Sequence, residues 1–262
     1  MAFHEQDQLR YYSFDILAEA SIDQGIFTRK GGVSPNPWNS LNTGGTNGDQ
    51  RENVIENRRR IFSAFDRKVE TIFDVWQVHG KKIISTNDAR PLDAAHQKAD
   101  GILTNQKNIT LFMRFGDCVP IYFYDPIKRV IGISHAGWQG TAEKIVQETV
   151  KTMQTNYGSH PVDILAGIGP SICGKHYEFS GQALEFVQKS LKDEAKDILF
   201  EKEGKTHFDL WRANYLLLIQ AGLKHEHIQI SGVCTAENLD DWYSHRAERG
   251  KTGRFGALLG LK

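Results

Sequence analysis

Cysteine is scarce in this 262-residue chain, which contains only Cys118, Cys173 and Cys234. An odd and sparse set argues against a disulfide framework and is typical of proteins in a reducing compartment. The first ten residues, MAFHEQDQLR, also lack the charged and then apolar pattern of a signal peptide. Both observations lead us to expect a cytoplasmic protein.

A net charge is missing too, because 32 Lys and Arg residues balance 32 Asp and Glu residues. Without a broad basic field we expect neither nucleic acid nor anionic lipid as a partner. No apolar run approaches the roughly 18 residues of a membrane span, so no membrane association is expected, and no protein partner is evident. No linker or internal repeat divides the sequence, and residues 1–262 are therefore expected to form a single domain.

The most informative stretch is a predicted hairpin. Two apolar runs, Val119–Tyr124 and Val130–Ser134, flank the sequence Asp-Pro-Ile-Lys. Asp at the first position and Pro at the second favour a type I turn, so the runs are expected to pair as antiparallel strands. A turn centred between Pro126 and Ile127 predicts that Asp125 faces Lys128.

The same register predicts that Cys118 stands directly opposite His135, with Cβ atoms about 4.5–5.5 Å apart. A thiol and an imidazole at that distance touch each other or share a metal ion. The alternative is a buried cysteine beside a core histidine. A slip of one residue would place the two side chains on opposite faces.

A second histidine, His79, lies in Gln-Val-His-Gly at the end of a predicted strand, Thr71–Val78. Together with Cys118 and His135 it gives two imidazoles and one thiolate. Catalytic zinc keeps three protein ligands and one open position, so these residues are a candidate metal site that the fold must assemble. Asp117 is expected to orient one of the imidazoles.

Other strands and helices follow from local patterns. The segment that follows His135 is rich in glycine, from Gly137 to Gly140, and is expected to open a helix that continues to about Asn156. Free N–H groups at such a helix start favour an anion. Arg246 and Arg254 lie beside glycines in the C-terminal segment and are further candidates for binding an anion. Further strands are expected at residues 24–29, 81–86, 99–105, 109–115, 162–168 and 227–233, and further helices at residues 47–65, 180–191 and from residue 209 to about 222.

Eight short motifs, taken in order, make the chain resemble the YfiH-type family. They are Ser40-Leu41-Asn42, Gln77-Val78-His79-Gly80, Ala99-Asp100-Gly101, Gly116-Asp117-Cys118, His135-Ala136-Gly137-Trp138, Ile168-Gly169-Pro170, Tyr177-Glu178 and Thr252-Gly253-Arg254. Members of this family are described as purine nucleoside phosphorylases and, in older usage, as laccase-type multicopper polyphenol oxidoreductases. The resemblance runs nearly from end to end.

The resemblance implies an α/β (α+β) fold with mixed sheets in α/β/β/α layers, related to the catalytic domain of cytotoxic necrotizing factors. It implies a metal, usually zinc with copper as an alternative, on the residues that match His79, Cys118 and His135. It implies phosphorolysis of adenosine, inosine, guanosine and methylthioadenosine, with adenosine deamination. One departure is Gln139, which stands where the family commonly has arginine and weakens an anion-binding role at that position.

On this interpretation the candidate catalytic residues are Cys118, His135 and Asp117. The candidate residues for nucleoside and phosphate are Asn42, Asp100, Gly137, Arg246 and Arg254. Three other interpretations stay open at the level of sequence. In one of them the chain is not an enzyme, and a fourth residue completes a purely structural metal site. A metal-independent hydrolase would use Cys118 as a nucleophile activated by its histidine neighbour. A copper-dependent phenol oxidase would need many clustered imidazoles, whereas the only His-x-His pair is His225-Glu226-His227.

Overall fold

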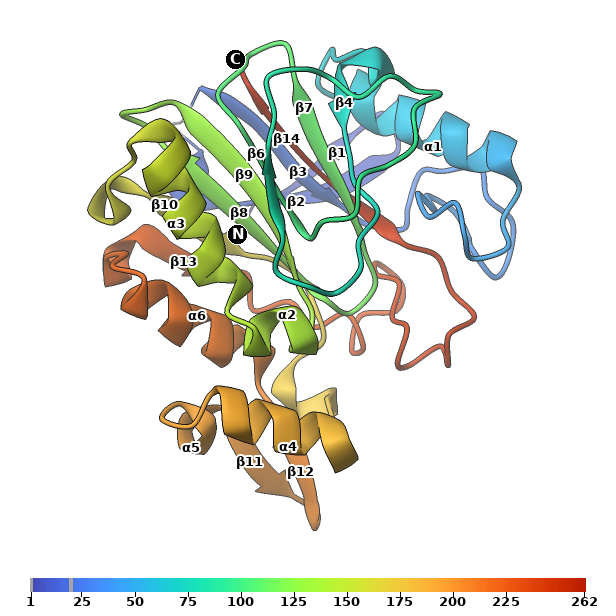
Figure 1. Cartoon of the computed structure of the whole chain (residues 1–262). Helices are drawn as coiled ribbons and strands as arrows, with labels where there is room; N and C mark the ends of the chain where they lie inside the picture. The colour runs from blue at the N-terminus through green and yellow to red at the C-terminus, as the bar shows by residue number, and fades with distance from the viewer. Residues whose placement is uncertain (1, 19–20) are drawn as a thin grey trace.

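The computed structural model describes residues 2–18 and 21–262. Most of its strands form two mixed sheets of six strands each (Figure 1). The first sheet has the order β1 (Ala2–Gln6), β2 (Leu9–Ser13), β3 (Ile22–Phe27), β14 (Phe255–Leu261), β7 (Thr110–Phe115) and β4 (Ile72–Phe73). The second has the order β13 (Ile228–Ile230), β10 (Leu165–Ile168), β8 (Val119–Asp125), β9 (Val130–Ala136), β6 (Gly101–Thr104) and β5 (Ile83–Ser85).

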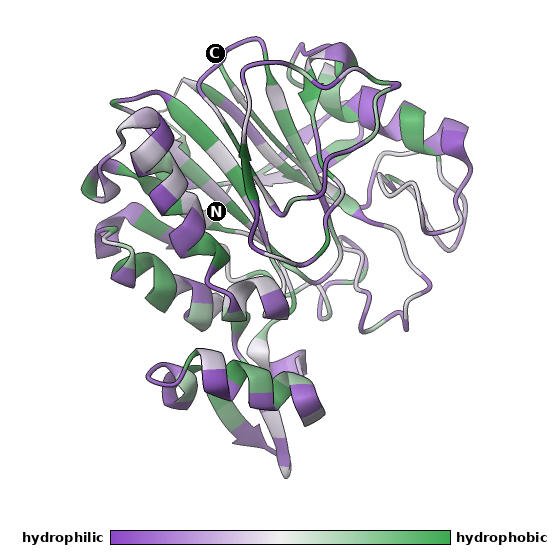
Figure 2. Ribbon diagram, viewed as in Figure 1, coloured by the Kyte–Doolittle hydropathy of each residue, from purple (hydrophilic) through white to green (hydrophobic). Residues whose placement is uncertain are grey.

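The two sheets stack face to face, and helices cover their outer faces. Helix α1 (Arg51–Ser63) packs on the first sheet through Ile61 and Phe62. Helices α3 (Ile145–Tyr157) and α6 (Leu210–Gln220) pack on the second. Side chains from both sheets fill the space between them, and Figure 2 shows hydrophobic residues along these strands. The predicted α/β/β/α layering is therefore confirmed.

A smaller unit projects from one end of the second sheet (Figure 1). It consists of α4 (Gly181–Ser190), α5 (Ala195–Ile198), β11 (Leu199–Lys202) and β12 (Lys205–Phe208). Trp138 of the short helix α2 (Trp138–Ala142) joins it to the rest of the protein, with its ring centroid 6.2 Å from that of Phe186.

In the described part of the chain, no helix combines the length and the apolar character needed to cross a bilayer.

The predicted hairpin exists, but its register differs by two residues. Asp125 pairs with Val130 and not with Lys128, and Pro120 stands opposite His135. The connection is longer than a two-residue turn because Arg129 adopts a left-handed conformation and Asp125 Oδ1 accepts the N–H groups of Ile127 and Lys128. A shift of two residues preserves the face, so Cys118 and His135 remain on the same side as diagonal neighbours.

Two other predictions need correction. The helix expected to run to Asn156 is interrupted, because Lys144 has a φ of +65° and separates α2 from α3. The strand expected over Thr71–Val78 is only β4, because the chain then leaves the sheet and Trp76 exchanges backbone hydrogen bonds with Gln97 and Ala99.

Three strands of the first sheet were not predicted, namely β1, β2 and β14. Strand β14 is buried on both faces between β3 and β7, so its apolar sequence FGALLGL lacks the alternation that marks a half-buried strand. Arg254 immediately precedes this strand and lies next to the candidate site.

Candidate metal and nucleoside site

The three predicted metal ligands come together where strand ends of the two sheets meet. His79 follows β4, Cys118 immediately precedes β8, and His135 lies near the end of β9. One ligand atom from each lies within 4.8 Å of the others, and the two imidazole rings are 4.9 Å apart between centroids. His135 is buried, Cys118 is partly buried and His79 is exposed, so the group opens to solvent on the His79 side.

Asp100 fixes both histidines. Its Oδ1 lies 2.9 Å from Nδ1 of His135, which leaves Nε2 as the ring nitrogen available to Cys118 and a metal. The same carboxylate accepts the N–H groups of Val78, His79 and Gly80. These hydrogen bonds hold His79 at a φ of +63°, a conformation that non-glycine residues rarely adopt.

The electrostatics of this group favour an ionised thiol. Burial alone would raise the pKa of Cys118, but the charge and hydrogen bond of His135, with those of His79, lower it to about 6. Burial lowers the pKa of His135, whereas the Cys118 thiolate and Asp100 raise it to about 9. A thiolate beside imidazoles is the form in which cysteine binds a metal or attacks an electrophile.

Gly137 leaves the space that this group occupies. A Cβ atom at Gly137 would lie 3.0 Å from Sγ of Cys118 and 3.3 Å from Cδ2 of His79. A Cβ atom at Gly140, one helical turn later, would lie 2.9 Å from the carbonyl oxygen of Gly80. Because α2 has only five residues, the requirement for glycine here follows from close packing against the ligands and not from a long helix dipole.

Asp117 does not orient a histidine, so that prediction is wrong. Its Oδ1 accepts the hydroxyl hydrogen of Thr235 at 2.7 Å, and its Oδ2 accepts the backbone N–H of Arg246 at 2.6 Å. Asp117 thus fixes the segment that carries Arg246, while Asp100 takes the place predicted for it. Sequence could not separate the two aspartates, because both precede strands that lead toward the site.

The two candidate arginines lie at the same end of the molecule. Arg246 donates from Nη1 to the carbonyl oxygen of Glu178, and its guanidinium lies 4.9 Å from the centroid of the Tyr177 ring. Burial lowers the pKa of Arg254, whereas the negative charges of Cys118 and Asp117 raise it, with a net lowering. Arg254 is therefore close enough to the thiolate to contribute positive charge to the site.

Asn42 holds its own loop together and fixes the backbone of Arg254. It is completely buried, and its Oδ1 accepts the backbone N–H groups of Gly44 and Arg254. Its Nδ2 donates to Asp49 and to the carbonyl oxygen of Gly44. Like the oxygens of Asp100, these amide atoms are already engaged by the protein.

Sequence reasoning missed several neighbours of the site. Tyr177 lies under Arg246, Thr235 binds Asp117, and His245 Nδ1 is 3.4 Å from Nη2 of Arg254. Tyr177 was noted only as part of the motif Tyr177-Glu178, without a role at the site. No local pattern marks Thr235 or His245, because they reach the site from segments that are distant in sequence. Gln139, the departure from the family pattern, donates to Glu143 within the same turn of chain.

The donor set suits a metal. Two imidazole nitrogens and one thiolate sulfur, open on one side, are the three-ligand arrangement that catalytic zinc uses, and they suit copper as well. The missing Cβ of Gly137 leaves the ligands unobstructed. The fold and the site thus define a four-layer α/β/β/α protein with a His–Cys–His group and arginines at one end of its sheets.

The chain belongs to the family described as multi-copper polyphenol oxidoreductase laccase, whose model matches residues 23–262. Purine nucleoside phosphorylase YlmD of Bacillus subtilis is 39% identical over 246 residues, which cover 91% of this chain and 88% of that protein. Its counterpart of the same name in Geobacillus stearothermophilus is 36% identical over 245 residues, which cover 91% of this chain and 89% of that protein.

Solved structures agree with this assignment. The crystal structure of the hypothetical protein YfiH from Bacillus licheniformis has a TM-score of 0.91 and 34% identity, and the match covers 99% of both chains. The crystal structure of YlmD from Geobacillus stearothermophilus has a TM-score of 0.90 and 32% identity, with 99% of this chain and 98% of that chain covered.

Proposed function

We propose that this chain is a purine nucleoside phosphorylase that acts on adenosine, inosine, guanosine and methylthioadenosine and also deaminates adenosine. The observation that carries the proposal is the convergence of His79, Cys118 and His135 beside Arg254. The names of the relatives in Bacillus subtilis and Geobacillus stearothermophilus support the same reaction class. We further propose zinc as the metal, with copper as the alternative.

In phosphorolysis a phosphate oxygen forms a bond to C1′ of the ribose, while the bond from C1′ to the purine nitrogen breaks. The purine leaves with the bonding electrons and takes up a proton. The site must therefore hold a dianion, orient the ribose and assist the departing base. We assign the phosphate to Arg246 and Arg254, because guanidinium groups bind phosphate oxygens in a bidentate manner.

His79 is the exposed member of the ligand group, so we propose that the nucleoside approaches from its side. A metal held by His79, Cys118 and His135 would supply Lewis-acid chemistry to both phosphorolysis and deamination. Cys118 and His135 are the catalytic residues in this proposal. Asp100, Asp117 and Asn42 are positioning residues, because their side chains act through His135, Arg246 and Arg254.

The decisive experiment incubates purified wild type and Cys118→Ala with each nucleoside, with and without phosphate, and separates the products by chromatography. Elemental analysis is carried out on the same samples. We expect free base and ribose 1-phosphate (5-methylthioribose 1-phosphate from methylthioadenosine) only when phosphate is present, inosine from adenosine in both conditions, and loss of all products in Cys118→Ala. A folded, metal-loaded wild type that yields no base, no ribose 1-phosphate and no inosine would refute the proposal.

The ionised Cys118 beside His135 also favours a second candidate, a metal-independent hydrolase. That function requires that the metal-free protein be alkylated stoichiometrically at Cys118 and remain active on a hydrolysable substrate. The copper-dependent phenol oxidase is tested in parallel by loading the protein with copper and following phenol oxidation. Activity that persists after metal removal, or oxidation at a catalytic rate, would replace the phosphorylase assignment.

A further inference from the structure

A second group of metal-ligating side chains lies outside the site described above. It consists of Cys173, His176, Cys234 and Glu237. The first two belong to the loop that follows β10, and the other two belong to the segment that follows β13. Within each pair the residues are three apart in sequence, a spacing that brings two side chains of one loop to the same ion.

The separations from Nδ1 of His176 to the other three ligand atoms are close to those of a tetrahedral site. With zinc–sulfur bonds of about 2.3 Å and zinc–nitrogen or zinc–oxygen bonds of about 2.0–2.2 Å, a tetrahedron places sulfur about 3.6 Å from nitrogen and nitrogen about 3.4 Å from oxygen. Nδ1 of His176 lies 3.3 Å from Sγ of Cys173 and 3.8 Å from Sγ of Cys234. The same nitrogen lies 3.4 Å from Oε1 of Glu237, and all four ligand atoms lie within 4.8 Å of one another.

Burial differs across the group in a way that suits an ion. Both sulfurs belong to buried residues, whereas His176 and Glu237 are exposed and close the group from the solvent side. The backbone N–H of Cys173 donates to Sγ of Cys234 at 3.3 Å, so the two segments already meet at this sulfur. The two buried sulfurs are thus fixed in position, and the two exposed side chains complete the set of four ligands.

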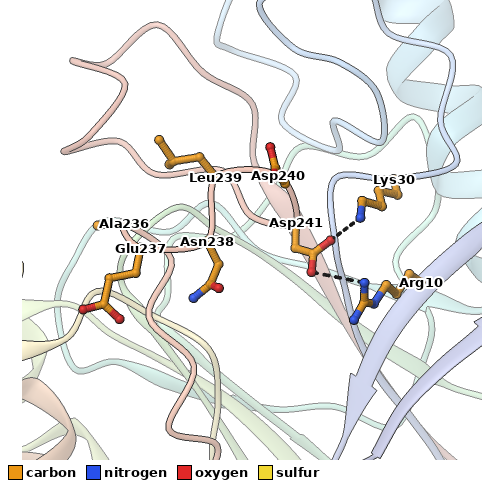
Figure 3. Close-up of a pocket in the computed structure, with 8 residues that line it drawn as sticks. All are labelled: Arg10, Lys30, Ala236, Glu237, Asn238, Leu239, Asp240 and Asp241. Carbon is orange, nitrogen blue, oxygen red and sulfur yellow. Dashed lines mark ion pairs between the residues drawn. The ribbon is translucent and has the colours of Figure 1, made fainter.

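Glu237 takes no part in the ion pairs that Asp241 forms with Lys30 and Arg10. It lines a cavity of about 480 Å³ together with Asp241, Lys30 and Arg10. Asp241 pairs there with Lys30 at 2.6 Å and with Arg10 at 3.4 Å. Figure 3 shows the carboxylate of Glu237 pointing away from these three residues, so it is free to serve the cysteine cluster.

We propose that Cys173, His176, Cys234 and Glu237 bind a zinc ion with four protein ligands, as a structural site separate from the His79–Cys118–His135 group. Two thiolates, an imidazole and a carboxylate in tetrahedral array select zinc over hard cations. Four protein ligands leave no open position for a reacting molecule, which is the arrangement of structural zinc.

The ion would join two segments that each contact a residue of the candidate active site. Ser171 and Cys234 already form a parallel bridge between these segments. Just beyond His176, Tyr177 stacks under Arg246, and just beyond Cys234, Thr235 binds Asp117. The zinc site therefore fixes the two segments that hold Arg246 in place, without contributing a group to the reaction.

The test counts zinc in two backgrounds, after gel filtration of protein saturated with zinc. Wild type is expected to retain about two equivalents per chain, and Cys118→Ala about one. In the Cys118→Ala background, His176→Ala with Glu237→Ala is expected to remove the remaining equivalent. Both added substitutions are at exposed positions, with side chains 40% and 48% accessible, so they leave the core intact. His160→Ala, at another exposed histidine, is the matched control and is expected to retain the ion.

A second measurement identifies the ligands. Cobalt added to metal-free Cys118→Ala is expected to give near-ultraviolet bands of thiolate-to-cobalt charge transfer, and these bands are expected to disappear in Cys118→Ala combined with Cys234→Ser. Zinc retention that is the same with and without His176 and Glu237 would overturn the proposal. A disulfide between Cys173 and Cys234 in protein purified under reducing conditions would overturn it as well. Neither result depends on nucleoside phosphorolysis, so the proposed function and this site can fail separately.

Discussion

Oδ1 of Asp100 lies 2.9 Å from Nδ1 of His135, and this contact determines which ring nitrogen His135 presents to the candidate metal group. The same carboxylate binds three successive backbone N–H groups in the turn that carries His79. One buried side chain therefore positions two of the three ligands. The contacts of Asp100 that the structure shows are therefore contacts that position other residues of the site.

This relationship predicts the effect of Asp100→Asn. The amide has nearly the same shape, but it carries no charge and must turn an N–H₂ group toward backbone donors or toward His135. We expect metal affinity to fall by about 10–100-fold, with a parallel loss of kcat/KM. Competition with a chromophoric chelator measures the affinity. Asp93→Asn, at an exposed position of the loop before β6, is the control, and an unchanged affinity in Asp100→Asn would contradict the assigned role.

Gly137 offers a test of the space around the ligands. Its φ of −74° suits alanine, so Gly137→Ala should fold, but the new Cβ would meet Cys118 Sγ at 3.0 Å. A displaced ligand costs about 100-fold in activity when the shift approaches 1 Å, and we expect a loss of this order. Gly45→Ala, where no atom lies within 4 Å of an added Cβ, should be neutral. Steady-state kinetics and circular dichroism together distinguish a crowded site from a misfolded chain.

The assignment of phosphate to the arginines predicts a selective change in KM. In Arg254→Lys the charge remains but the planar fork is lost. We expect KM for phosphate to rise about tenfold or more, equivalent to at least about 1.4 kcal/mol, while KM for the nucleoside changes little. Arg249→Lys, at an exposed position in the same segment, controls for a general loss of arginine. Equal increases in both KM values would show that Arg254 supports the site without binding phosphate.

A buried ion network around Asp74 leads to a prediction about stability. The carboxylate of Asp74 is fully buried and pairs with Arg90 at 2.7 Å and with Arg114 at 2.8 Å. Removing its charge in Asp74→Asn leaves both guanidinium groups without their partner, which costs about 3–5 kcal/mol. Urea unfolding measures this change. Glu56→Gln breaks exposed pairs with Arg59 and Arg60 instead and should cost no more than about 1 kcal/mol.

The same network predicts whether folding stability rises or falls with pH. Burial alone would raise the pKa of Asp74, but the hydrogen bond of His96 and the charge of Arg114 lower it. A carboxylate whose pKa is lower in the folded chain adds stability above its unfolded pKa of about 3.9, and the contribution is lost as the pH falls through the folded pKa. Wild type should therefore lose stability below about pH 4 more steeply than Asp74→Asn. If wild type and Asp74→Asn lose stability equally steeply below about pH 4, the ionised Asp74 does not explain the loss.

The local sequence was sufficient for those elements whose signal lies within one turn or one strand. A helix was predicted from residue 209, and the side chain of Asp209 accepts the N–H of Arg212 at the start of α6. The pairing of β8 with β9 followed from two apolar runs around Asp-Pro. The register of this pair did not follow from the sequence, because Arg129 adopts a left-handed conformation that lengthens the connection. Arginine is not a residue type that indicates such a conformation. An error of two residues left Cys118 and His135 on one face, as the alternation of a strand requires.

The sequence by itself determined the chemistry available to this protein: few cysteines, three candidate ligands of the right types in glycine-flanked motifs, and arginines near the C-terminus. Only the tertiary structure decided which carboxylate serves which group, since Asp100 and Asp117 have similar local settings but different partners. It also brought Cys173 and His176 to Cys234 and Glu237 across 61 residues of chain, although the spacing within each pair was visible in the sequence. Contacts between distant segments depend on how the sheets stack and where their strands end, and local residue patterns carry little information about either.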